Sequence, residues 1–145
     1  MPRLAITHDP LQPWQQLADY EATSLPRGHY GATAVFVGTM RDFNDDSSVS
    51  AMTLEYYPGM TERHLARICD GVEQQYGLLD TLLIHRVGTL LPGEPIVLLA
   101  VWSAHRREAF IACRELMEQL KSKAPFWKRE ERPDGSRWVE QNHPG

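Results

Sequence analysis

All three lysines of the chain lie within the eight-residue segment KSKAPFWK at 121–128. Lys121 and Lys123 fit a solvated helix end, where cations interact favourably with the helix dipole. Lys128 differs, because it follows Pro-Phe-Trp on an expected strand. Burial among aromatic rings makes an ammonium group a better proton donor. The segment therefore indicates either an ordinary exposed helix end or a site of acid–base chemistry, because perturbed groups cluster at functional sites.

Two further basic elements could act with these lysines. The segment SAHRR at 103–107 lies where an apolar strand meets a helix, and free N–H groups at a helix start suit an anion. Capping by Ser103 with His105 and Arg106 exposed is the simpler reading, although two cations there oppose the helix dipole. Arg41 ends a buried strand in the segment GTMR. Together the three elements predict a cationic pocket for an anionic, phosphorylated small molecule, with lysines as its acid–base groups.

Composition excludes several protein classes. The 145-residue chain carries a net charge of −4, although residues 105–137 hold 9 basic and 6 acidic side chains. Two cysteines and scattered histidines support neither a disulfide scaffold nor a structural metal. No apolar run reaches the roughly 18 residues of a membrane span, and polar residues interrupt the N-terminal segment early. We therefore expect a cytoplasmic protein without a metal, and the histidines at 8, 29, 64, 85 and 143 receive no role.

The hydrophobic pattern predicts a single α+β domain over residues 1–145, with helices packed on a mixed or antiparallel sheet. Apolar residues recur on one face of two expected helices, at 60–76 and 105–121. The most apolar run, 95–103, has the length of a central strand, and a Pro-Asp-Gly-Ser turn predicts a C-terminal hairpin. The remaining expected elements are strands at 4–7, 31–40, 51–57 and 81–87, a helix at 13–20 and a loop at 41–50.

Seven segments follow one another between residues 31 and 140. They are VGTMR (37–41), LEYYPGMTE (54–62), IHRVG (84–88), PGE (92–94), SAHR (103–106), LKSKAPFWKRE (120–130) and RW (137–138). Together they resemble the family of large, catalytic subunits of molybdopterin synthase. The pattern Lys-x-x-Ala-Pro-Phe-Trp-Lys-Arg-Glu is nearly diagnostic by itself.

The resemblance implies an α/β-hammerhead-like fold and a homodimer within a heterotetramer, with one small sulfur-carrier subunit at each end. The carrier's Gly-Gly thiocarboxylate tail would enter the pocket. The substrate would be cyclic pyranopterin monophosphate (precursor Z), which two sulfur transfers convert into the molybdopterin dithiolene. No cofactor, metal, nucleic acid or membrane is implied.

The resemblance also assigns site residues. Lys121 and Lys128 would be catalytic. Substrate would be bound by Thr39, Met40, Arg41, His105, Arg106, Lys121, Lys128, Arg129 and Glu130.

Helix geometry adds a condition to these assignments. His105 and Lys121 lie at opposite ends of one expected helix without Gly or Pro, and a rise of 1.5 Å per residue separates them by about 24 Å. One small substrate cannot contact both ends. We therefore expect the site to be shared across a two-fold dimer.

Two alternatives remain from the sequence. The segment 121–129 could stack on and clamp single-stranded nucleic acid as a binding module, although the chain is acidic overall. The chain could also be a silent scaffold that only holds the carrier, although both lysines are present.

Overall fold

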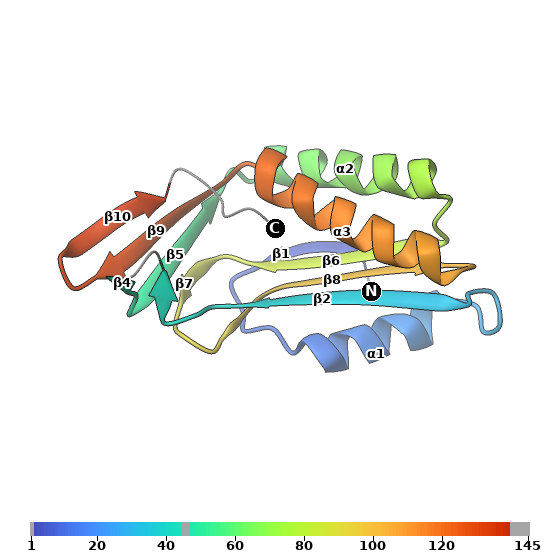
Figure 1. Cartoon of the computed structure of the whole chain (residues 1–145), viewed down its shortest axis with the longest axis horizontal. Coiled ribbons are helices and arrows are strands. Elements are labelled where there is room, and N and C mark those ends of the chain that lie inside the picture. The colour runs from blue at the N-terminus through green and yellow to red at the C-terminus, as the bar shows by residue number, and fades with distance from the viewer. Residues whose placement is uncertain (1, 45–46, 140–145) are drawn as a thin grey trace.

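The computed structural model describes residues 2–44 and 47–139. Figure 1 shows one sheet with helices on both of its faces and a second sheet beyond one end of it. The strands of the first sheet run in the order β1-β6-β8-β2, and only β1 is parallel to its neighbour. Their bounds are β1 Leu4–Thr7, β6 Asp80–Arg86, β8 Pro95–Ser103 and β2 Ala32–Thr39.

The strand β8 is central because its sequence PIVLLAVWS has no charged side chain, and every residue from Val97 to Ser103 is buried. Alternate residues of a strand face opposite sides of a sheet. Leu99 and Val101 accordingly belong to one hydrophobic cluster, and Leu98 and Trp102 belong to another on the opposite face.

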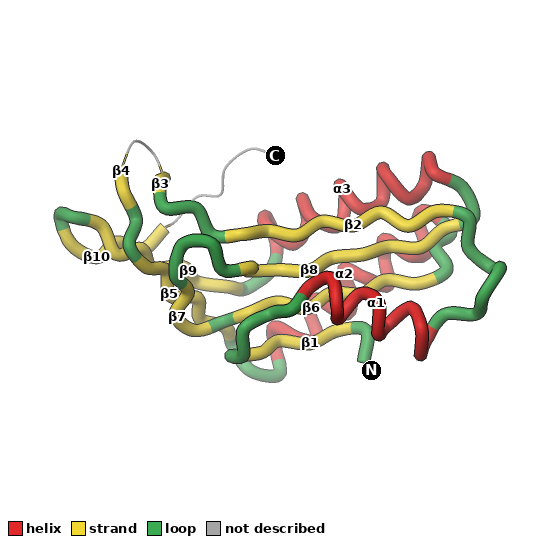
Figure 2. Tube along the Cα trace, turned by 90° about the horizontal axis from the view of Figure 1, so that it is seen from below, coloured by secondary structure: helices red, strands yellow, loops and turns green. Residues whose placement is uncertain are grey.

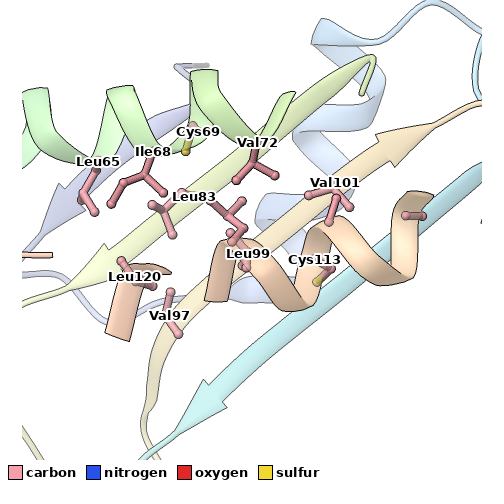
Figure 3. Close-up of a cluster of buried hydrophobic side chains, with 13 residues drawn as sticks. Leu65, Ile68, Cys69, Val72, Leu83, Val97, Leu99, Val101, Cys113 and Leu120 are labelled. Atoms are coloured by element: carbon pink, nitrogen blue, oxygen red, sulfur yellow. The ribbon is translucent and has the colours of Figure 1, made fainter. Parts of the chain in front are cut away.

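Three helices cover these two faces (Figures 1 and 2). The helices α2 (Met60–Tyr76) and α3 (Arg106–Lys123) pack on the Leu99 side, where Figure 3 shows their apolar side chains meeting those of β6 and β8. The helix α1 (Pro13–Ser24) covers the other face, and the ring of its Tyr20 stacks on Trp102 at 5.4 Å between centroids.

The second sheet is antiparallel throughout and has the order β10-β9-β5-β7. Its bounds are β10 Gly135–Val139, β9 Phe126–Arg132, β5 Ala51–Tyr56 and β7 Gly88–Leu90. The register places Leu54 opposite Lys128 and Met52 opposite Glu130. A third hydrophobic cluster, which includes Met52 and Leu54, packs against Ile96 of the first sheet and thereby joins the two sheets.

These observations confirm the α+β class, the mixed sheet, the two main helices and the C-terminal hairpin. Four local predictions were incomplete. The first helix extends to Ser24, and the hairpin belongs to a larger sheet through β5. The strand β7 was not predicted, and the expected loop at 41–50 contains a short strand pair, β3 (Phe43–Asn44) with β4 (Ser47–Ser48).

The described residues contain no helix long and apolar enough to cross a membrane. Within the same residues, no group of three or more His, Cys, Asp or Glu side chains gathers in a way that could hold a metal ion.

Candidate active site

A cavity of about 550 Å³ lies where the two sheets meet, beside the last turn of α3. Apolar side chains of β5 and β8 form part of its wall. The residues that give it chemical character are Gly38 and Thr39 of β2, His85 of β6, Lys121 of α3, and Phe126 and Lys128 of β9.

The two lysines of the cavity come from different elements. Lys121 lies in the last turn of α3, and Lys128 is the third residue of β9. Only Ala124 and Pro125 separate the helix from the strand, because proline and the residue before it disfavour continuation of a helix. The short connection brings both ammonium groups to one cavity, whereas Lys123 at the same helix end does not line it.

The carboxylate of Glu130 is buried beneath this wall. The residue is 3% exposed, and its Oε1 accepts hydrogen bonds from Nε and Nη2 of Arg132 at 3.0 and 2.5 Å. Its Oε2 lies 3.8 Å from Nζ of Lys128. Lys128, Glu130 and Arg132 occupy alternate positions of β9 and so share one face of the strand. The carboxylate of Glu130 therefore forms ion pairs with two cations, Lys128 and Arg132.

His85 is a wall residue that received no role from its sequence context. It is 7% exposed, and its ring stacks on Phe126 with centroids 4.1 Å apart and planes 17° apart. Nδ1 lies 2.7 Å from the carbonyl oxygen of Arg86. Burial lowers the pKa of His85 from 6.5 to about 4. The segment IHRVG contains the only sequence signal that could have found this residue, since a histidine within an apolar strand is buried.

Thr39, the last residue of β2, lines the cavity, whereas the next two residues, Met40 and Arg41, do not. A Cβ on Gly38 would lie 2.9 Å from Cγ1 of Val97, so glycine is needed at this close approach. The pairing shifts register between Gly38 and Thr39. Met40 is 5% exposed and packs in the third cluster, while Arg41 is exposed and does not line the cavity.

His105 and Arg106 lie at the far end of α3. The helix is continuous from Arg106 to Lys123. The separation of about 24 Å expected between His105 and Lys121 from the rise per residue therefore holds. Both residues are exposed, and neither lines the cavity of this chain. Ser103 does not cap the helix through its side chain, because its Oγ donates to the carbonyl oxygen of His105 at 2.6 Å.

Arg129 projects from the opposite face of β9. Its Nε lies 3.5 Å from Oε1 of Glu131, and its guanidinium lies 5.7 Å from the ring centroid of Trp138. It does not line the cavity.

The two thiols take no part in this site. Cys69 and Cys113 both pack in the cluster between α2, α3 and the first sheet (Figure 3). Burial raises the pKa of each thiol to about 11, which leaves it protonated and unreactive.

The arrangement combines two cations, a buried imidazole and apolar walls. Ammonium groups stabilise anions and donate protons, and the apolar strands exclude water around them. A partly apolar molecule with an anionic group suits this combination of residues.

Comparison with known proteins gives consistent matches. The model of the family described as "MoaE protein" matches residues 6–123. The molybdopterin synthase catalytic subunit of Ralstonia nicotianae is 54% identical over 123 residues, which cover 85% of this chain and 70% of the relative. The subunit of the same name from Escherichia coli K12 is 50% identical over 114 residues, covering 79% and 76%. A crystal structure of molybdopterin synthase from Staphylococcus aureus superimposes with a TM-score of 0.85 at 32% identity, covering 97% of this chain and 99% of that chain.

Proposed function

Because the chain belongs to the MoaE protein family, we propose that it is the catalytic subunit of a molybdopterin synthase. In this reaction sulfur passes from the thiocarboxylated C-terminus of a small carrier subunit to cyclic pyranopterin monophosphate. Two transfers build the dithiolene of molybdopterin, and each leaves a carboxylate on the carrier. Relatives that are 54% and 50% identical to this chain over the aligned residues are named for this enzyme.

The placement of Lys121 and Lys128 on one cavity is the observation that supports the proposal most directly. The thiocarboxylate and the substrate phosphate are both anions. Two ammonium groups neutralise their mutual repulsion and can donate protons where negative charge develops. Glu130 forms an ion pair with Lys128, with its Oε2 3.8 Å from Nζ.

The other site residues fall into two groups. Thr39 lines the cavity and can contact substrate directly. Met40, Arg41, Arg129 and Glu130 do not line it, so direct substrate contact by these residues stays a prediction.

His105 and Arg106 require a second copy of the chain. A two-fold dimer could place these residues of one copy at the cavity of the other. In the proposed assembly this homodimer binds one carrier at each end, and each carrier tail enters one cavity. The proposal takes residues 1–145 as one domain and places the enzyme in the cytoplasm.

The alternative of a nucleic-acid-binding module is not supported. A clamp built from the segment 121–129 needs both of its aromatic rings exposed on one surface. Phe126 stacks instead on His85, and Trp127 lies on the opposite face of β9.

Reconstitution tests the proposal. The purified protein is incubated with precursor Z and a thiocarboxylated carrier, and the dithiolene product is detected. We expect wild-type turnover, and a loss of about 10²–10⁴-fold for Lys121→Ala and for Lys128→Ala. Lys123→Ala is the matched control, because this lysine ends the same helix without lining the cavity. Absence of product with the wild type, or unimpaired turnover by a folded Lys128→Ala protein, would contradict the proposal.

A further inference from the structure

The imidazole of His85 stands on the cavity wall without a role in the proposed transfer. It lies on β6 at 7% exposure and lines the same cavity as Lys121 and Lys128. The stacked ring of Phe126 covers one of its faces and limits its rotation.

The hydrogen bond to Arg86 fixes which nitrogen of the ring carries the proton. A carbonyl oxygen only accepts, so Nδ1 donates across the 2.7 Å to the carbonyl oxygen of Arg86. A neutral imidazole has one protonated nitrogen, and its other nitrogen is an acceptor. Nε2 of His85 therefore carries a lone pair.

This lone pair belongs to a residue of the cavity wall. In residues 2–44 and 47–139, the fully buried side-chain nitrogens without a hydrogen-bond partner are Nε of Arg86 and Nε of Arg129. Nε2 of His85 is not one of them. His85 is one of the residues that line the cavity, so the residue borders the space that a ligand would occupy.

The cavity thus offers two kinds of polar group. Lys121 and Lys128 donate hydrogen bonds and attract anions, whereas a lone pair on Nε2 repels an anion and attracts an N–H group. Precursor Z has both an anionic cyclic phosphate and N–H groups on its pterin ring. We propose that Nε2 of His85 accepts a hydrogen bond from an N–H group of the pterin ring and so helps select and orient the substrate. This inference rests on the proposed function.

Binding of precursor Z in the absence of the carrier tests the inference without turnover. The variant His85→Asn keeps an N–H group near the position of Nδ1 and removes the acceptor. We expect its Kd for precursor Z, measured by fluorescence titration, to rise about 10-fold, as for loss of one buried hydrogen-bond partner. His29→Asn, at an exposed loop position, should bind like the wild type.

Steady-state kinetics separate substrate selection from chemistry. For His85→Asn the KM for precursor Z should rise by a similar factor while kcat falls less than about 2-fold and the KM for the carrier is unchanged. His85→Gln, which returns an acceptor oxygen, should recover part of the affinity. A folded His85→Asn protein with wild-type Kd would overturn the inference, as would a loss confined to kcat.

A measurement on the wild type removes dependence on folding of the variants. In protein with ¹⁵N-labelled histidine, Nε2 of His85 should resonate as an unprotonated nitrogen and shift upfield when precursor Z binds. An unchanged resonance at saturation would refute the hydrogen bond. If the wild type forms no product in the reconstitution, the proposed function fails. Product formation without these His85 effects refutes the role of His85 alone.

Discussion

Oε2 of Glu130 lies 3.8 Å from Nζ of Lys128, and the two side chains share the inner face of β9. Lys128 is 29% exposed as a side chain, whereas Glu130 is 4% exposed. The carboxylate is thus the buried member of the pair, and its charge attracts the ammonium group of Lys128. It also accepts two hydrogen bonds from Arg132, which fixes the carboxylate in turn.

Replacing Glu130 by glutamine should therefore reduce turnover through Lys128. We expect Glu130→Gln to lower kcat about 10-fold in the wild-type background. In the Lys128→Met background, Glu130→Gln should lower kcat little further. The comparison is a double-mutant cycle on kcat. Glu131→Gln, on the outer face of the same strand, should leave kcat unchanged. If Glu130→Gln lowers kcat by the same factor in the wild-type and Lys128→Met backgrounds, Glu130 acts independently of the lysine.

The same substitution should destabilise the fold. Arg132 is 9% exposed as a side chain and would keep its charge while losing the Glu130 carboxylate that accepts two of its hydrogen bonds. Breaking a buried ion pair on one side costs about 3–5 kcal/mol. Urea denaturation of Glu130→Gln and Glu131→Gln measures the difference, and equal free energies of unfolding would contradict it.

Mixed dimers should reveal whether the active site is shared. Arg106→Ala and Lys121→Ala proteins should each be inactive. A heterodimer of the two has one cavity with both lesions and one intact cavity, so activity should return to about half of the wild-type value per dimer. Differently tagged chains purified together provide the sample. Inactive heterodimers of confirmed composition would refute the shared site.

The close approach at Gly38 should make alanine unfavourable there. The added Cβ would lie 2.9 Å from Cγ1 of Val97, which is itself 3% exposed. Overpacking of this kind costs about 1–3 kcal/mol. Gly71→Ala is the matched control, since it lies inside α2 and a Cβ added there would meet nothing within 4 Å. That variant should gain up to about 1 kcal/mol. Thermal unfolding of both proteins decides the matter, and a stabilised Gly38→Ala would contradict the packing.

The buried ring of His85 should weaken the fold in acid. Its pKa is lowered from 6.5 to about 4 by burial, so the unfolded chain takes up a proton first as the pH falls. The contribution of His85 to the free energy of unfolding should therefore be constant above pH 6.5. Between pH 6.5 and 4 this contribution should decrease by up to about 3 kcal/mol. Denaturation of the wild type and His85→Phe across this range should show a smaller acid loss in the variant. Parallel curves would show that the ring is not buried as a neutral base.

Much of the fold was predictable because the signals are local. The apolar positions of 60–76 and 105–121 recur at helical spacing, and both helices were predicted to within a few residues. The strand β8 was predicted from its uninterrupted apolar run. The pairing of β5 with β9 was not, because it joins segments that lie far apart in the chain and depends on tertiary packing.

In the candidate site, too, the residues found from the sequence are those with local signals, and the others depend on the fold. Lys121 and Lys128 were found because they are close in sequence and flank an aromatic segment. His85 was missed because its partner in the cavity, Phe126, is distant in the chain and only the fold brings the two rings together. Burial of Glu130 likewise depends on the pairing of β9 with β5.

The two-residue connection Ala124-Pro125 also constrains how this chain can change in length. Side chains of a strand alternate between two faces, so one inserted residue before Phe126 would exchange the faces of β9 relative to α3. Trp127 would then face the cavity, and Lys128 would face away from it. Inserting two residues would restore the faces but displace Lys128 along the strand. The seven-position interval between Lys121 and Lys128 therefore fixes both the side and the depth at which the second lysine enters the cavity.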